Sequence, residues 1–220
     1  MIGTVARRIV TIIGPCDVVH CVVKVPIGLV FSALAAYALA RIPFKGFQIV
    51  LLLIVLGAMI PIQIVIAPLF RLVNDIGLLN TYVGLILPYI GFGVPYQVFV
   101  LYAFFRANPK VLDEAASIDG ASYLRIFWSV HLPIMLPVLA ALFILDFVGT
   151  WNEFAIASFL LPGQEMHTVP LTLMRFQSQW MTAYGPLNVT ILLATVPIIA
   201  VYMVFQRYFV SGLSAGAVKG

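Results

Sequence analysis

Residues 113–149 read DEAASIDGASYLRIFWSVHLPIMLPVLAALFILDFVG. The first eight residues form a short acidic segment that ends in a glycine, whereas the run from Leu132 to Gly149 is almost entirely apolar. A helix needs about 20 mostly apolar residues to cross the hydrocarbon core of a bilayer. The stretch therefore predicts a membrane span that is preceded by a polar connection.

The composition of the whole chain supports the same class. Of the 220 residues, 63% are hydrophobic and 9% are charged, whereas soluble domains carry about 25% charged residues. So few charges could not cover the surface of a soluble fold of this size. The formal net charge of +4 comes from basic residues that form no cluster. It therefore indicates no nucleic-acid partner, and we interpret it through the positive-inside rule.

Five windows have, or nearly have, the length and apolar character of a span. Their runs are continuously apolar, and backbone groups in lipid must be hydrogen-bonded within their own segment. They predict an all-α polytopic membrane protein with a bundle of kinked helices, because prolines recur within or beside the runs. The windows are 25–40, 47–70, 82–105, 132–149 and 187–205. The first is short, and we expect Lys24 to extend its ammonium group to the membrane surface.

Basic residues in the connections predict the orientation. Five spans place the two termini on opposite sides, and the positive-inside rule places the more basic connections in the cytoplasm. The acidic segment and the C-terminus would then be cytoplasmic. The basic residues on that side are Arg41, Lys45, Arg106, Lys110, Arg125, Arg207 and Lys219, against Arg71 and Arg175 on the other side.

The N-terminal segment fits this orientation poorly, because Arg7 and Arg8 would lie outside. The apolar run 9–13 is too short for the core of a signal peptide, and Asp17 follows it closely. We expect residues 1–24 to be atypical: a weak extra span, a surface segment, or a truncated or altered first span.

Two cysteines, Cys16 and Cys21, flank His20. A structural zinc site needs about four ligands, and only three candidates occur here. We therefore expect no metal site, and we expect the cysteines to pack as small apolar residues.

The acidic segment predicts a helix followed by a tight turn. Asn108-Pro109 is a favourable start, because asparagine caps helices and proline suits the first turn. Asp113 and Glu114 would lie near the positive N-terminal end of the helix dipole. We expect the helix to end at Asp119-Gly120, since a glycine readily takes the left-handed conformation.

A second helix is predicted from Ala121. Leu124, Phe127, Trp128 and His131 follow the i, i+3, i+4, i+7 spacing of one mostly apolar face, on which we expect His131 to pack rather than to relay protons. The two helices would form an elbow. From the residues alone, the elbow is either a docking surface for a soluble partner or a solvated connector between spans.

The spacing of particular residues favours the docking surface. Glu114-Ala115-Ala116, Gly120, Val130 and Leu132-Pro133 follow the pattern E-A-A-x3-G-x9-I-x-L-P, with valine in place of isoleucine. The segment resembles the signature of binding-protein-dependent ABC importer permeases. Tyr37-Ala38-Leu39-Ala40-Arg41 and Trp151-Asn152-Glu153-Phe154 resemble the carbohydrate-uptake subfamily of the maltose-permease type. The resemblance runs from about residue 34 to the end.

The resemblance implies a type I ABC importer transmembrane domain over residues 25–220. The chain would be a permease subunit in the cytoplasmic (inner) membrane of a bacterium or archaeon, and it would form part of the pathway for a sugar. The cytoplasmic loop 106–131 and the residues after it would dock onto an ATPase. The docking residues would be Glu114, Ala115, Ala116, Asp119, Gly120, Leu132 and Pro133.

The resemblance also implies the partners. They would be a cytoplasmic ABC ATPase dimer, a second permease subunit, an extracytoplasmic solute-binding protein and the lipid bilayer. A P-loop needs a lysine after a glycine, and none of the four lysines follows one. We therefore expect ATP and Mg to be used by the partner ATPase, and we expect this chain to bind no cofactor and to have no enzymatic activity.

Three polar residues near the outer boundary are candidates for the translocation path or its outer mouth. Asp146 is the only carboxylate within an apolar span, and intramembrane acids are often functional. It would line the path or make an interfacial or helix–helix contact. Asn152 and Glu153 would line the outer mouth or contact the solute-binding protein. A permease for another small polar solute (polyol, glycerol phosphate, amino acid or peptide) and, more remotely, a membrane-embedded enzyme remain alternatives.

Overall fold

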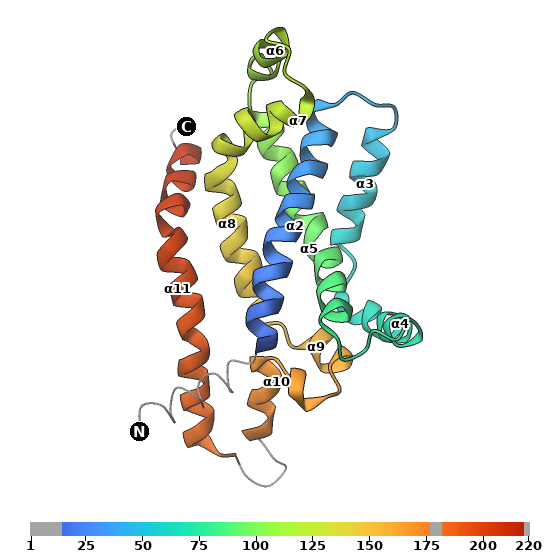
Figure 1. Cartoon of the computed structure of the whole chain (residues 1–220), viewed down its shortest axis with the longest axis vertical. Helices are drawn as coiled ribbons and strands as arrows, with labels where there is room; N and C mark the ends of the chain where they lie inside the picture. Colours follow the sequence, from blue (N-terminus) through green and yellow to red (C-terminus); the bar gives the residue numbers. More distant parts are fainter. Residues whose placement is uncertain (1–14, 177–181, 218–220) are drawn as a thin grey trace. The chain divides into compact units, whose positions relative to one another are not determined.

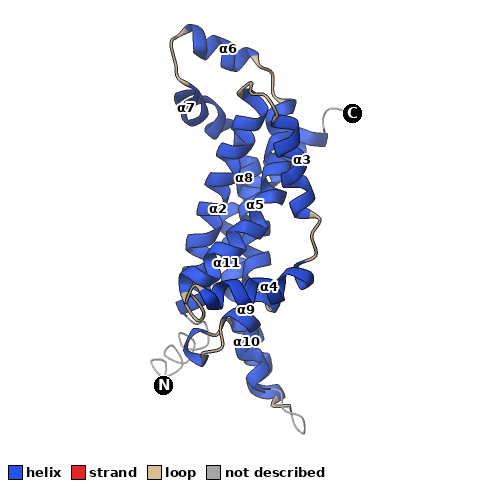
Figure 2. Ribbon diagram, turned by 90° about the vertical axis from the view of Figure 1, so that its right-hand side faces the viewer, coloured by secondary structure: helices blue, strands red, loops and turns tan. Residues whose placement is uncertain are grey.

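The computed structural model describes residues 15–176 and 182–217, with side chains described for 16–176 and 182–207. Every element among these residues is a helix (Figure 2). The residues group into two compact units. Unit 1 comprises Ile60–Ile90 and Leu145–Val204 with the chain up to Pro26, and unit 2 comprises Ile27–Met59, Gly91–Ile144 and the chain from Phe205.

Four long helices contribute residues to both units. They are α2 (Pro15–Arg41), α5 (Tyr82–Ala107), α8 (Leu132–Trp151) and α11 (Tyr184–Ala217). Four helical stretches are long and apolar enough to cross a membrane: Cys16–Arg41, Tyr82–Ala107, Tyr123–Trp151 and Tyr184–Arg207. They confirm the all-helical membrane architecture, and they show that the first span begins earlier than the predicted window 25–40.

The predicted window 47–70 is not one continuous helix. It contains α3 (Phe47–Ala58) and most of α4 (Ile62–Asp75), and Pro61 lies between them with extended backbone, φ −62° and ψ 129°. A proline cannot donate the backbone hydrogen bond that would continue α3. The helices α3 and α4 are long and apolar enough to cross a membrane only when they are taken together as one bent segment. With that segment, the described part of the chain has up to five spans.

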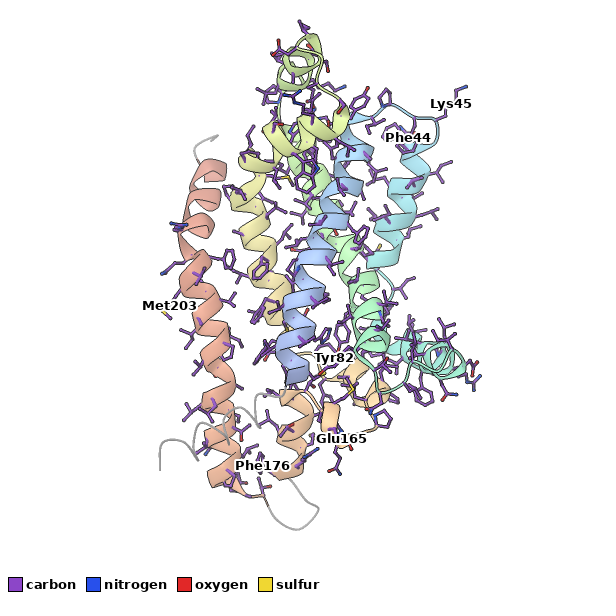
Figure 3. The ribbon with its side chains drawn as sticks, in the orientation of Figure 1. Phe44, Lys45, Tyr82, Glu165, Phe176 and Met203 are labelled. Atoms are coloured by element: carbon purple, nitrogen blue, oxygen red, sulfur yellow. The ribbon has the colours of Figure 1, made fainter. Side chains whose placement is uncertain are left out.

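Unit 2 is built around the second half of α2. Tyr37 packs its ring against Phe105 of α5 and against Phe127 and His131, with ring centroids 5.3–5.6 Å apart. Ser32 of α2 donates a 2.7 Å hydrogen bond to Gln97 of α5. The helix α6 (Val111–Ile118) and the connection from α2 to α3, which carries Phe44 and Lys45, lie at the same end of this unit (Figures 1 and 3).

Unit 1 contains the short helices α9 (Ala155–Leu160) and α10 (Val169–Leu173). Both are tied to distant parts of the chain. The Asn80 backbone N–H donates to Leu160 O at 2.9 Å, and its side-chain Oδ1 accepts from the N–H of Gly163 at 3.0 Å. Both carboxylate oxygens of Asp17 accept from the N–H of Val169, the first residue of α10, at 3.0 and 3.1 Å. Glu165 lies on the nearby 3₁₀ turn η2 (Gln164–Met166; Figure 3).

The first turns of α2 place polar residues on a buried face. Residues 17, 20, 21 and 24 share one side of a helix, and Asp17, His20 and Lys24 are all buried. The prediction that Lys24 reaches the membrane surface is wrong, because its side chain is 3% exposed and its Nζ lies 2.5 Å from Asp146 Oδ1. Cys16 and Cys21 are buried free cysteines. Of the atypical segment 1–24, residues 1–14, with Arg7 and Arg8, lie outside the described residues, as does Lys219.

Candidate functional site

The acidic helix α6 ends as predicted. The N–H of Ala121 donates to Ala116 O and the N–H of Gly120 donates to Ser117 O, each at 3.0 Å. These two bonds form a Schellman motif, in which the residue after the C-cap takes the left-handed conformation. Gly120 does so with φ +76°. The turn is therefore held by backbone hydrogen bonds.

The predicted cap at the start of α6 is wrong. The helix begins at Val111, and Lys110 at its N-cap makes no side-chain capping bond. Asn108 instead completes the last turn of α5, because its backbone N–H and its side-chain Nδ2 both donate to Phe104 O, at 3.3 and 3.1 Å. Asn108 therefore hydrogen-bonds to the end of α5 (Tyr82–Ala107) and does not cap α6.

The second arm of the elbow is not a uniform α-helix. The short helix α7 (Tyr123–Ile126) leads into the π-helical turn η1 (Phe127–His131), which leads into α8. Phe127 and His131 are buried, as expected, but Leu124 and Trp128 are 63% and 50% exposed. The four residues therefore do not share one buried face, and the π turn from Phe127 to His131 adds one residue to the helical register that follows it.

Asp113 on α6 joins the arms of the elbow. Its Oδ1 lies 2.7 Å from Nε2 of His131, and its Oδ2 lies 3.3 Å from Nε of Arg41, the last residue of α2. Arg41 also donates from an Nη to Asn108 O at 2.9 Å. The side chains of Arg41 and His131 are 3% and 1% exposed, against 18% for Asp113. We call Asp113, Arg41 and His131 the elbow clamp.

Most of the surface of α6 is exposed. Glu114 and Ala115 are exposed and Ala116 is half-buried, and Ile118 is 86% exposed. Asp119, Gly120 and Pro133 are also exposed, whereas Leu132 is half-buried. An open hollow of about 410 Å³ lies beside α6, lined by Arg41, Lys110, Asp113, Glu114, Ser117, Ile118 and Tyr123. The surface thus combines acidic groups with exposed apolar side chains.

In unit 1, Asp146 makes a helix–helix contact. Its Oδ1 pairs with Lys24 of α2, and the same ammonium donates to Thr150 Oγ1 at 3.1 Å. The Asp146 side chain is 14% exposed, and its Oδ2 is buried without a hydrogen-bond partner. The pairing was missed from the sequence because the two residues lie 122 positions apart.

The two other polar candidates, Glu153 and Asn152, differ in their surroundings. Glu153 is turned toward the protein: it accepts from the N–H groups of Ile156 and Ala157 at 2.9 and 3.3 Å, and from the hydroxyl of Tyr89. It therefore holds the start of α9. Asn152 is exposed and lines a hollow of about 110 Å³ with residues of α10 and α11.

No group of three or more His, Cys, Asp and Glu side chains among the described residues could hold a metal ion. Within the same residues, the candidate site consists of the α6 surface with its clamp and, separately, the polar cluster of unit 1, which is formed by Lys24, Asp146 and Thr150.

Comparisons with known proteins agree with these features. The family model described as "Binding-protein-dependent transport system inner membrane component" matches residues 28–215. The chain is 36% identical to the "Probable ABC transporter permease protein YurM" of Bacillus subtilis over 91% of its own length and 65% of that protein's. It is 38% identical to the "Arabinooligosaccharides transport system permease protein AraQ" of Halalkalibacterium halodurans, covering 90% and 71% of the two chains.

Two further likenesses extend the comparison. The "Trehalose/maltose transport system permease protein MalG" of Thermococcus litoralis is 37% identical, over 86% of this chain and 68% of that protein. A chain in the "Crystal structure of a bacterial ABC transporter involved in the import of the acidic polysaccharide alginate" superposes with a TM-score of 0.73 at 26% identity, over 90% and 74% of the two chains. This chain belongs to the family of binding-protein-dependent transport system inner membrane components.

Proposed function

We propose that this chain is the permease subunit of an ABC importer that carries a carbohydrate. The names of the relatives support the substrate class, since they include transport systems for arabinooligosaccharides and for trehalose and maltose. The observation that carries the proposal is α6: a protruding acidic and apolar helix, closed by a backbone-bonded turn, in a chain of this family.

In this proposal α6 docks onto a cytoplasmic ATPase. Glu114 is exposed and available to pair with a basic group, while Ala115 and Ala116 are small enough to allow close approach. Asp119 and Gly120 set the turn, and Leu132 and Pro133 lie in the first turn of α8. ATP and Mg are used by an ATPase dimer, and closure of the dimer moves the elbow.

The remaining partners follow from the same proposal. A second permease subunit completes the pathway, and an extracytoplasmic solute-binding protein delivers the sugar. The grouping of α6 with the Lys45 connection at one end of unit 2 supports a cytoplasmic position for both (Figure 3). Five spans, with the bent pair counted as one, support the proposal that the C-terminus is also cytoplasmic. Asn152 is exposed and belongs to the outer mouth, whereas the contacts of Asp146 and Glu153 favour roles in holding helices.

The docking surface is tested by crosslinking. A Ser117→Cys variant, with Cys16 and Cys21 replaced by alanine, should crosslink to lysines of the ATPase in membrane vesicles when a thiol- and amine-reactive bifunctional reagent is added. Glu114→Lys should abolish carbohydrate uptake at an unchanged membrane level, and Glu165→Lys is the control for a charge reversal at another exposed glutamate. Persistent absence of crosslinks from residue 117 and its neighbours, or normal uptake by Glu114→Lys, would refute docking at α6.

A further inference from the structure

We propose that the elbow clamp transmits movement of α6 to the long helices α2 and α8, with Asp113 as the positioning residue at its centre. The inference rests on the proposed docking of α6 to an ATPase and assigns a distinct task to residues behind the docking surface. Glu114 and its neighbours bind the partner, and Asp113 passes the displacement on.

The helix α6 makes little use of apolar packing. None of its eight residues is buried, and Ile118 and Val111 are 86% and 66% exposed. The bonds of its C-terminal turn run within the segment itself, so they stiffen α6 without attaching it to other helices. The polar contacts of Asp113 therefore provide its tertiary attachment.

The clamp connects α6 to two helices through a single carboxylate. One oxygen is directed to Nε2 of His131, which precedes α8, and the other to Nε of Arg41, which ends α2. The contact with His131 is a hydrogen bond to a carboxylate, and such bonds are stronger than those between neutral groups. The contact with Arg41 is an ion pair at 3.3 Å, in which neither Nε nor Oδ2 makes a hydrogen bond. Because each oxygen has a different partner, a shift of α6 displaces both partners.

The far ends of the clamp are fixed in a packed core. The His131 ring has its centroid 5.3 Å from those of both Tyr37 and Phe105. Arg41 is almost completely buried, and it also holds the carbonyl of Asn108 at the start of the loop. Close-packed interiors transmit displacement because side chains have little free volume. The clamp thus joins the exposed helix α6 to residues that are packed in the core of unit 2.

The π-helical turn places His131 where the clamp needs it. Residues 127–131 form the π turn, and Phe127 and His131 both point into the aromatic core. Single π turns in longer helices often occur at functional positions. The extra residue rotates the start of α8 so that the imidazole reaches Asp113.

The experiment separates docking from transmission in the assembled complex with its ATPase. Crosslinking from Ser117→Cys reports docking. A second readout is the labelling of Asn152→Cys by a membrane-impermeant maleimide, with and without ATP, which reports rearrangement at the outer end of α8. In Asp113→Asn we expect the crosslink yield to stay within about twofold of the wild type. The ATP-dependent change in labelling should fall about tenfold, because the substitution removes the negative charge that pairs with the buried Arg41.

Conservative and matched variants complete the test. Asp113→Glu should restore part of the labelling response, and His131→Phe, which keeps the ring but cannot hydrogen-bond, should reduce it. Asp75→Asn removes an exposed carboxylate at the end of α4 and should change neither readout. A full ATP response in Asp113→Asn overturns the clamp, and so does loss of its crosslink, because Asp113 would then serve docking. Absence of the crosslink when Asp113 is intact would instead refute the proposed function.

Discussion

Replacing Lys24 with methionine should strongly destabilise unit 1, because it breaks a buried ion pair. Lys24 Nζ lies 2.5 Å from Asp146 Oδ1 and donates to Thr150 Oγ1 at 3.1 Å. Methionine matches the length of the lysine stem but leaves Asp146 without its ion-pair partner. The carboxylate is only 14% exposed and already has one buried oxygen without a hydrogen bond, so solvent can compensate little.

The expected magnitude follows from the burial of the pair. Removing one partner of a buried ion pair costs about 3–5 kcal/mol, whereas replacing both with apolar residues of similar size is often neutral. We therefore expect Lys24→Met and Asp146→Leu each to lower the free energy of unfolding by ~3 kcal/mol or more. The double variant should lie within about 1 kcal/mol of the wild type, which corresponds to a large coupling energy.

The assay is a double-mutant cycle on the purified protein in bicelles, with reversible unfolding followed by helical circular dichroism. Thr150→Val is the matched control, because it removes one hydrogen bond to the ammonium and keeps the ion pair; it should cost about 1.5–3 kcal/mol. Ordinary hydrogen bonds between membrane helices couple by only about 0.6 kcal/mol on average. Additive effects of the two single variants, or a coupling no larger than that average, would refute the assignment of a buried charge pair.

Two further predictions concern the connections around Gly163 and His167 in unit 1. Gly163→Ala should cost about 1–3 kcal/mol of stability, since an added Cβ would lie 2.4 Å from Asn80 Nδ2. Gly149→Ala is the control, because a Cβ at that position meets nothing within 4 Å. Equal melting temperatures of the two variants would contradict the close approach at Gly163. Burial and the guanidinium of Arg175, whose Nη donates to Nδ1 at 3.2 Å, hold the pKa of His167 below its ordinary value. Arg175→Ala should therefore raise the pKa of His167, which an NMR titration of the imidazole would measure. An unchanged titration midpoint would exclude an electrostatic contribution from Arg175.

The apolar windows could be read from the sequence because a membrane span needs only length and low polarity, and both are local properties. The end of α6 was equally predictable, since Asp119-Gly120 carries its own backbone preference. Pro61 indicated an interruption of the helix in the window 47–70. The sequence could not show its form, because a kinked single helix and two separate helices share the same apolar pattern.

The errors arise where local patterns compete with packing. The face predicted from Leu124, Phe127, Trp128 and His131 assumed a period of 3.6 residues, and no residue type marks the π turn that changes the register. Lys24 looked like an interfacial lysine because its partner, Asp146, is far along the chain. The clamp was missed for the same reason. Arg41 was considered only as a basic residue of a connection and Asp113 only as an acidic residue near the start of a helix, and the fold brings the two side chains together.

The bond between Asp17 and Val169 has a consequence for biosynthesis. The two residues are 152 positions apart, and ribosomes add about 5–20 residues per second. The acceptor at the beginning of α2 therefore leaves the ribosome roughly 8–30 s before its donor exists. During that interval the carboxylate lacks this backbone donor, so water or lipid headgroups must supply its hydrogen bonds until the later residues emerge.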